Sequence, residues 1–160
     1  MDTTLTDPEL YERDFHLWTQ RQAAELRRAA GTGSNLPLDW ANLAEEIESL
    51  GARDRREVAS RIEQIVLHLL KLAHSPAVDP RRGWQESVWA QRSEIGKILE
   101  QSPSLKGFVQ PALDTTWRGA RARAAAALAG EVDPAALPAA CPYTVDQILD
   151  PDFWPERAAP

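Results

Sequence analysis

Three glutamates near residue 46 and three histidines are the residues of this sequence best suited to binding a metal or transferring protons. Glu45 and Glu48 lie three residues apart and would share one face of a helix, while Glu46 would point elsewhere. A di-iron site in a helical bundle requires Glu-x-x-His on two helices, and none of the three histidines has a glutamate three residues before it. The sequence therefore predicts neither a metal nor a cofactor, and favours a solvated acidic face paired with neighbouring arginines.

A second set of polar residues falls where a helical repeat places it among apolar neighbours. These residues are Gln22, Asp54, Arg61, His68, Gln91 and Arg92. Asp54 lies nearest the centre of its apolar stripe. Because buried polar groups need partners, we expect an internal network in which Asp54 meets an arginine and the glutamines supply the remaining hydrogen bonds.

Three interpretations of this polar interior stay open. The set would fix the register of the helices, which is an attested role of polar groups in helical cores, and His68 would then be a hydrogen-bonded structural histidine. It could instead form a ligand or metal site, since perturbed charges in a cavity also mark function. The third alternative is that the helical phase differs and some of these residues are exposed.

A long amphipathic helix over residues 39–73 is the strongest element that the pattern predicts. Its apolar residues recur at steps of three and four, or at twice that spacing: Leu43, Ile47, Leu50, Val58, Ile62, Ile65, Leu69 and Leu72. Asp39 is expected to cap its start. Gly51 lies inside this pattern, where it could bend or divide the helix.

Four further elements complete the expected fold. Similar periodicity predicts helices over residues 8–29, 81–101 and 111–129, and a capping box predicts a short helical turn over 144–149. The first would begin with a second capping box, Thr6 to Glu9. No segment alternates with the period of a strand. We expect one all-α domain over residues 1–160, a four-helix-bundle-like fold with the C-terminal tail packed back on it.

The composition limits where the protein acts and what it binds. The net charge is −6, which argues against general affinity for phosphate backbones. Three arginines of the fourth helix, Arg118, Arg121 and Arg123, would spread around it, so nucleic-acid binding is a weak alternative. The single cysteine, Cys141, excludes an internal disulfide and fits a reducing compartment. We find no signal peptide and no membrane-spanning run, and expect a cytoplasmic protein.

Several motifs, in order along nearly the whole chain, resemble the bacterial family called domain of unknown function twenty-nine. They include residues 11–18 (YERDFHLW), residues 43–51 (LAEEIESLG), residues 68–71 (HLLK), residues 102–105 (SPSL) and residues 141–144 (CPYT). The resemblance implies a helical bundle and no assigned activity. The positions that match the family's motifs are Asp14, Trp18, Glu46, Glu48, His68, Lys71, Gln91 and Arg92.

These observations favour a non-enzymatic interaction module that self-associates or binds a protein partner. Trp89 lies off the apolar stripe of its helix and Trp40 opens another, so both could offer aromatic surface. The alternative is a small enzyme or metal protein with a carboxylate, histidine and arginine site; a small-molecule ligand is not predictable. The candidate polar network comprises Asp14, Gln22, Glu46, Glu48, Asp54, Arg61, His68, Gln91 and Arg92.

Overall fold

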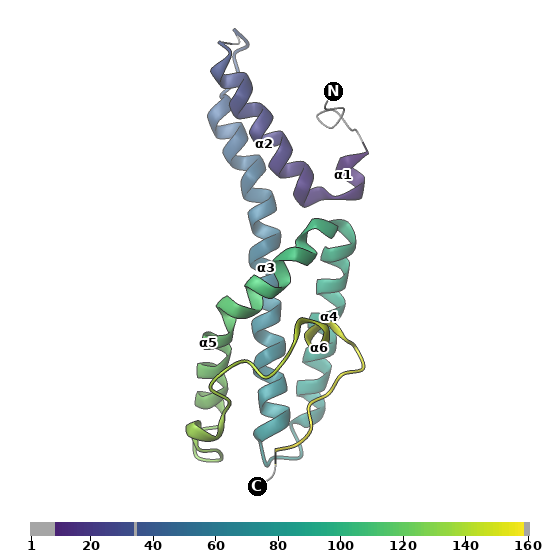
Figure 1. The fold of residues 1–160 in the computed structure, drawn as a ribbon, viewed down its shortest axis with the longest axis vertical. Coiled ribbons are helices and arrows are strands. Elements are labelled where there is room, and N and C mark those ends of the chain that lie inside the picture. Colours follow the sequence, from purple (N-terminus) through teal and green to yellow (C-terminus); the bar gives the residue numbers. More distant parts are fainter. Residues whose placement is uncertain (1–8, 34, 159–160) are drawn as a thin grey trace. The chain divides into compact units, whose positions relative to one another are not determined.

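The protein is all-α, which confirms the predicted fold class. The structure, a computed structural model, describes residues 9–33 and 35–158, and no residue in these two ranges forms a strand. The elements are α1 (Leu10–Arg13), α2 (Phe15–Gly31), α3 (Trp40–His74), α4 (Arg81–Gln101), the 3-10 helix η1 (Pro103–Phe108), α5 (Val109–Ala127), the 3-10 helix η2 (Pro134–Ala136) and α6 (Val145–Leu149) (Figure 1). Within the described ranges, no helix combines the length and apolar character that a membrane span requires.

The chain forms two compact units, and each is described by itself. Unit 1 comprises Met1–Glu57 with Ile98–Lys106, and unit 2 comprises Val58–Lys97 with Gly107–Pro160. The helices α3 and α4 each contribute residues to both units. A single domain over residues 1–160 stays a prediction.

In unit 1 the first predicted helix is interrupted, so the expectation of one helix over residues 8–29 is wrong. Asp14 takes a non-helical conformation (φ −157°, ψ 89°) between α1 and α2. Its carboxylate accepts a hydrogen bond from the Leu17 backbone N–H at 2.9 Å and so caps α2. The apolar spacing runs on across this break, which is why periodicity alone does not reveal it. The predicted cap at Thr6 lies outside the described residues.

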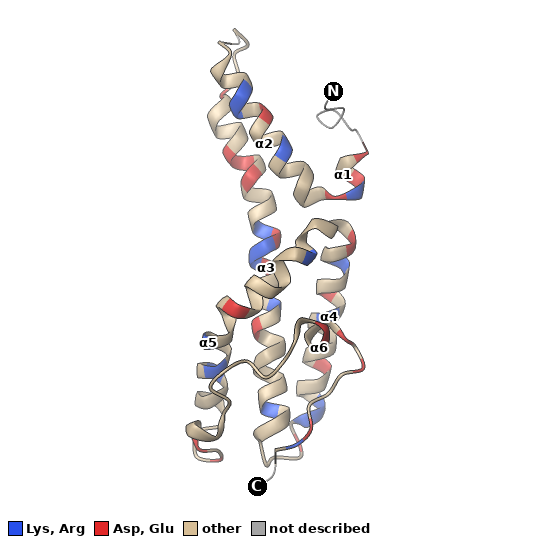
Figure 2. Cartoon of the chain, in the orientation of Figure 1, with Lys and Arg blue, Asp and Glu red and all other residues tan. Residues whose placement is uncertain are grey.

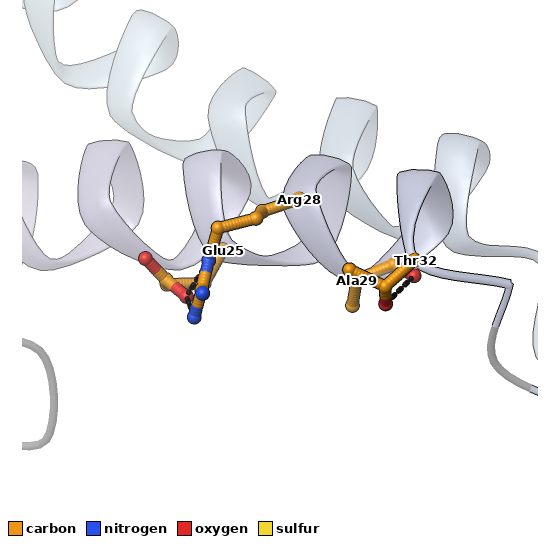
Figure 3. A network of polar contacts seen from close by, with 4 residues as sticks. All are labelled: Glu25, Arg28, Ala29 and Thr32. Carbon is orange, nitrogen blue, oxygen red and sulfur yellow. Dashed lines mark hydrogen bonds and ion pairs between the residues drawn. The ribbon is translucent and has the colours of Figure 1, made fainter.

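The end of α2 is stabilised by local polar contacts. Arg28 donates from Nε to Glu25 Oε2 at 2.9 Å, one turn earlier on the same helix. The Thr32 hydroxyl donates to the Ala29 carbonyl at 2.9 Å and satisfies one of the carbonyls that a helix end leaves without an intrahelical partner (Figure 3). These exposed contacts fix the end of the helix rather than form a site.

Gly51 does not divide α3 into two helices, because α3 runs unbroken from Trp40 to His74. The glycine is buried, and a Cβ atom there would lie far inside van der Waals distance of Thr19 Oγ1 on α2. Gly51 therefore permits a close approach of α2 to α3 within unit 1. The predicted cap of α3 is confirmed, since Asp39 Oδ1 accepts from the Asn42 N–H at 3.2 Å.

The apolar stripe of α3 has two different environments. In unit 2 its residues form the core together with apolar residues of α4, α5 and α6: Val58, Ile62, Ile65, Leu69, Leu72, Val88, Ile95, Leu113 and Ile148 are all buried. In unit 1, Leu43 and Leu50 are 40% and 42% exposed. Periodicity identified the apolar face of α3, but it did not show how much of that face has a neighbour to cover it.

The C-terminal segment is folded back on unit 2, as predicted. The capping box of α6 is present: the Thr144 hydroxyl accepts from the Gln147 N–H, and the Gln147 side chain accepts from the Thr144 N–H. Beyond it, the Ala158 N–H donates to the Ala73 carbonyl at 2.8 Å. The segment therefore covers elements that lie far from it in the sequence.

Candidate functional site

A groove beside α4 in unit 2 is the candidate site. Its larger part is a cavity of about 630 Å³ between α4 and the residues that end α6, lined by Trp89, Ala90, Leu149 and Pro151 among others. Trp89 is 65% exposed, although a large aromatic side chain gains free energy from burial. We call this cavity, with the smaller one that shares Trp89, the Trp89 groove.

The smaller cavity has a different chemical character. It encloses about 310 Å³ and is lined by Trp89, Trp154, Glu86, Arg82 and Gln85. Two indole rings therefore border the same space as a carboxylate. Glu86 accepts from Arg82 Nε at 3.0 Å, but the side chains of this pair are 65% and 87% exposed, so solvent screens the interaction.

Arg92 fixes the wall of the groove that the C-terminal segment supplies. It is buried, and its guanidinium donates to the carbonyls of Gln147 at 2.9 Å, Ile148 at 2.9 Å and Phe153 at 3.0 Å. Gln147 and Ile148 belong to the last turn of α6, whose carbonyls have no helical partner and carry partial negative charge. The guanidinium carbon also lies 5.3 Å from the centre of the Trp154 ring. Burial lowers the pKa of Arg92, while the nearby Asp150 acts in the opposite direction.

Carboxylates dominate the chain that borders the groove. The segment from Thr144 to Glu156 contains four acidic residues and neither lysine nor arginine: Asp146, Asp150, Asp152 and Glu156, all exposed. Figure 2 shows acidic residues in α6 and in the chain that follows it. One of these charges, that of Asp150, is offset by Arg92. The segment that supplies one wall of the groove consequently has an excess of negative charge.

The predicted polar network is divided between the two units, with Asp54 in unit 1 and Arg92 in unit 2. Asp54 is half-buried in unit 1 and forms no ion pair within the described ranges; burial raises its pKa, and Glu57 acts in the same direction. Arg92 belongs to unit 2 and donates to carbonyls instead. The expectation that Asp54 meets an arginine stays a prediction, and the acceptors observed for Arg92 are backbone carbonyls.

Asp14, another member of the predicted set, accepts three hydrogen bonds. In addition to capping α2, its Oδ2 accepts from the Ser104 N–H at 2.7 Å and its Oδ1 accepts from the Ser104 hydroxyl at 2.8 Å. The neighbouring His16 N–H donates to the Ser102 hydroxyl at 3.1 Å. Asp14 therefore joins the start of α2 to η1 inside unit 1, which is a structural role.

The other candidate residues of unit 1 differ in their exposure to solvent and in their neighbours. Glu46 and Glu48 are exposed; Glu48 forms a surface ion pair with Arg27, which lowers the pKa of the carboxyl. Gln22 lines a cavity of about 360 Å³ with Trp40. Trp40 is half-buried there rather than an exposed aromatic surface like Trp89.

In unit 2, one of the two candidate glutamines forms a hydrogen bond with another candidate residue. Arg61 Nη1 donates to Gln91 Oε1 at 2.9 Å, so this arginine and glutamine join α3 to α4. His68 is half-buried, but its Nδ1 atom has no hydrogen-bond partner in the part of the chain that the structure describes. A structural role for His68 as a hydrogen-bonded histidine stays a prediction. Burial, followed by the charges of Lys71 and Arg123, lowers the pKa of His68.

Two of the three arginines of α5 form hydrogen bonds or ion pairs with other residues of unit 2. Arg121 donates to the carbonyls of Pro134, Leu137 and Pro138, and Arg123 pairs with Glu63 at 3.2 Å. Of the three arginines considered for nucleic-acid binding, Arg118 alone lacks such a contact to a described residue. Over residues 9–33 and 35–158, no three His, Cys, Asp or Glu residues are grouped so that they could hold a metal ion.

Because the described residues form helices and no strand, the protein is all-α with a bundle-like architecture, and one unit has a groove at its surface. The chain belongs to the family described as Domain of unknown function DUF29, whose model matches residues 10–154. The resemblance inferred from its motifs is thus confirmed. The chain is also similar to an α-helical protein of unknown function from Rhodospirillum rubrum, known from a crystal structure. The two are 30% identical, with a TM-score of 0.75, over 89% of this chain and 90% of that one. No curated protein matches the sequence.

Sequence reasoning found the centre of the groove and missed most of its walls. It singled out Trp89 because this residue lies off the apolar stripe of α4. It did not include Glu86, Leu149, Pro151 or Trp154 among the site residues. The available signal was the apolar character of Phe153 and Trp154 in a tail without helical periodicity, which indicated packing but not the face on which they pack.

Proposed function

We propose that this protein is a helical interaction module that binds another protein through the Trp89 groove. The observation that supports the proposal is the exposed indole of Trp89, which stands between two cavities on a helix whose apolar face is already buried. Tryptophan is enriched among the residues that dominate binding energy at protein interfaces. Such residues bind best against a preorganised wall, and Arg92 supplies one by holding the C-terminal segment.

The polar groups of the groove favour binding over catalysis. Glu86 and Arg82 pair with each other in solvent, and Arg92 is occupied by three carbonyls. The alternative of a small enzyme or metal protein, built on Glu48, Asp54, His68 and Arg92, has no comparable supporting observation, since Glu48 pairs with Arg27 and Arg92 donates to three carbonyls.

We further propose that the module acts in the cytoplasm of a bacterial cell. A single, half-buried cysteine, Cys141, suits a reducing compartment. The similar protein of known structure comes from a bacterium, Rhodospirillum rubrum.

Affinity capture with matched baits tests the proposal. Wild-type protein, Trp89→Ala and Leu50→Ala would be expressed in the native host, and the recovered proteins identified and quantified. Leu50 is the control because it is an exposed apolar residue on a helix outside the groove. We expect a protein that the wild type and Leu50→Ala recover equally, and that Trp89→Ala recovers at most at about a tenth of that level.

The recovered partner would then be purified and titrated against the same three proteins by calorimetry. Equal affinity for wild type and Trp89→Ala would contradict the proposal, as would a partner lost only with Leu50→Ala. Thermal unfolding of each variant establishes that a lost interaction does not arise from a lost fold.

A further inference from the structure

We infer that the segment bound in the Trp89 groove is basic: it presents an apolar side chain to the larger cavity and an adjacent lysine or arginine to the smaller one. This inference rests on the proposed function and names the chemical class of the partner. Three features of unit 2 support the inference: the lining of the larger cavity, the lining of the smaller cavity and the charge of the surrounding chain.

The larger cavity suits an apolar side chain. Trp89, Ala90, Leu149 and Pro151 contribute apolar surface to it. Its one cationic lining residue, Arg92, is buried and already donates to three carbonyls. Glu86 and Ser93 also line it, but the greater part of its lining is apolar. An aliphatic or aromatic group placed there would therefore be stabilised by leaving water, and Glu86, which also lines the smaller cavity, would lie beside the adjacent cation.

The smaller cavity suits a cation. Trp89 and Trp154 border it with indole rings, and ring faces attract ammonium and guanidinium groups. The cation–π contact of Arg92 with Trp154 shows that this indole already accepts a cation. Glu86 adds a carboxylate whose present partner, Arg82, is held only by a solvent-exposed contact. An incoming lysine or arginine can therefore replace Arg82 at Glu86 at small cost.

The charge of the surrounding chain acts in the same direction. Three exposed carboxylates follow one another along the segment that forms the wall, Asp146, Asp150 and Asp152, and Arg92 is the buried cation that offsets one of them. Complementary charge at the rim of an interface raises the association rate and excludes partners of like charge. A segment with acidic flanks would meet repulsion here, and one with basic flanks would meet attraction.

Two synthetic peptides of equal length test the inference. Both would be amphipathic helices with the same leucine positions; the first carries lysine and the second glutamate at every polar position. Their binding to the purified full-length protein would be measured by calorimetry. We expect the leucine–lysine peptide to bind at least about tenfold more tightly than the leucine–glutamate peptide. Its affinity should fall as salt is added.

Three variants assign the binding to the groove. Trp89→Ala should abolish binding of the leucine–lysine peptide. Glu86→Gln should weaken it about threefold through loss of the carboxylate beside the indoles. The matched control is Glu94→Gln, because Glu94 is an acidic residue of the same helix with its own exposed partner, Lys97, at 2.6 Å. This control should leave the affinity unchanged.

The outcomes separate the inference from the proposed function. Equal, Trp89-dependent binding of both peptides would overturn the basic character of the partner and leave the groove as a binding site. Binding of the basic peptide that survives Trp89→Ala would overturn the inference as general attraction to an acidic protein. Failure of both peptides to bind would overturn the inference and the proposed function together. A Trp89-dependent dimer without peptide would make a second copy of the chain the occupant and would also overturn the inference.

Discussion

Arg92 is a buried cation with backbone carbonyls as its hydrogen-bond acceptors. Its three acceptors come from the end of α6 and from the chain beyond it, which are separated from Arg92 by more than fifty residues of sequence. The planar guanidinium can satisfy several carbonyls at once because its donors diverge in one plane. A short helix such as α6 has little stability of its own, so this residue accounts for the order of the groove wall.

Replacing Arg92 with lysine should remove this order. An ammonium group cannot reproduce the planar arrangement of donors, so Arg92→Lys is expected to lower the free energy of unfolding by about 2–3 kcal/mol. Limited proteolysis should also become faster between residues 149 and 156. Urea denaturation and mass spectrometry of the fragments measure the two effects. Arg118→Lys, at an exposed arginine of α5, is the control; equal behaviour of the two variants would contradict the role of Arg92.

His68 should make the stability of the protein depend on pH. Its pKa is lowered in the folded state from an ordinary value of 6.5, chiefly by burial, so the unfolded chain binds a proton more readily. Stability therefore rises with pH across the interval between the folded and unfolded pKa values, and falls as the pH drops below about 6.5. Burial lowers the pKa of His16 and His74 in the same way.

The substitution His68→Gln should reduce, without abolishing, this loss of stability. The free energy of unfolding would be measured by urea denaturation at intervals between about pH 7.5 and 5.5. We expect a smaller decline for His68→Gln than for the wild type, with the remainder due to the other two histidines. An unchanged decline would show that His68 is not held neutral by its surroundings.

At the scale of elements, Gly51 decides how α2 and α3 pack within unit 1. Gly51→Ala would force the new methyl group against Thr19 and is expected to lower the free energy of unfolding by about 1–3 kcal/mol. The matched control is Gly96→Ala, because Gly96 is an exposed helical glycine with open space around it; that change should raise stability by about 0.5–1 kcal/mol.

Thermal and urea denaturation of the two alanine variants measures these opposite effects. Pairing Gly51→Ala with Thr19→Ala should recover part of the loss, since the clashing hydroxyl is then absent. A neutral or stabilising Gly51→Ala would contradict the close approach of the two helices.

Element positions were more predictable than their contacts. The α4 limits, the Asp39 cap and the Thr144 capping box follow from periodicity and capping chemistry, which are local properties of the sequence. The break at Asp14 was not predictable in this way, because the carboxylate that ends α1 is bound to Ser104, ninety residues away. Likewise, the amphipathic pattern placed Leu43 and Leu50 on the apolar face of α3 but could not predict that both side chains stay exposed.

At the scale of the whole molecule, the candidate site depends on which elements meet. Trp89 could be recognised as unusual from its position on α4 alone. Its neighbours Leu149, Pro151 and Trp154 reach the groove through the Arg92 contacts, and an arginine that donates to backbone carbonyls leaves no signature in the sequence. The acceptors of Arg92 could not be predicted for the same reason, since a pattern identifies a buried cation but not its acceptor.

The central claim is that the Trp89 groove holds a protein partner. A photoreactive phenylalanine analogue placed at position 93, where Ser93 is exposed and lines the larger cavity, leaves the Trp89 indole in place. A second variant carries it at position 50, and both would be activated in living cells of the native host. We predict one heavier, covalently linked species at position 93, containing the partner recovered by affinity capture, and no such species at position 50. The absence of any adduct at position 93, or the same adducts at both positions, would contradict the claim.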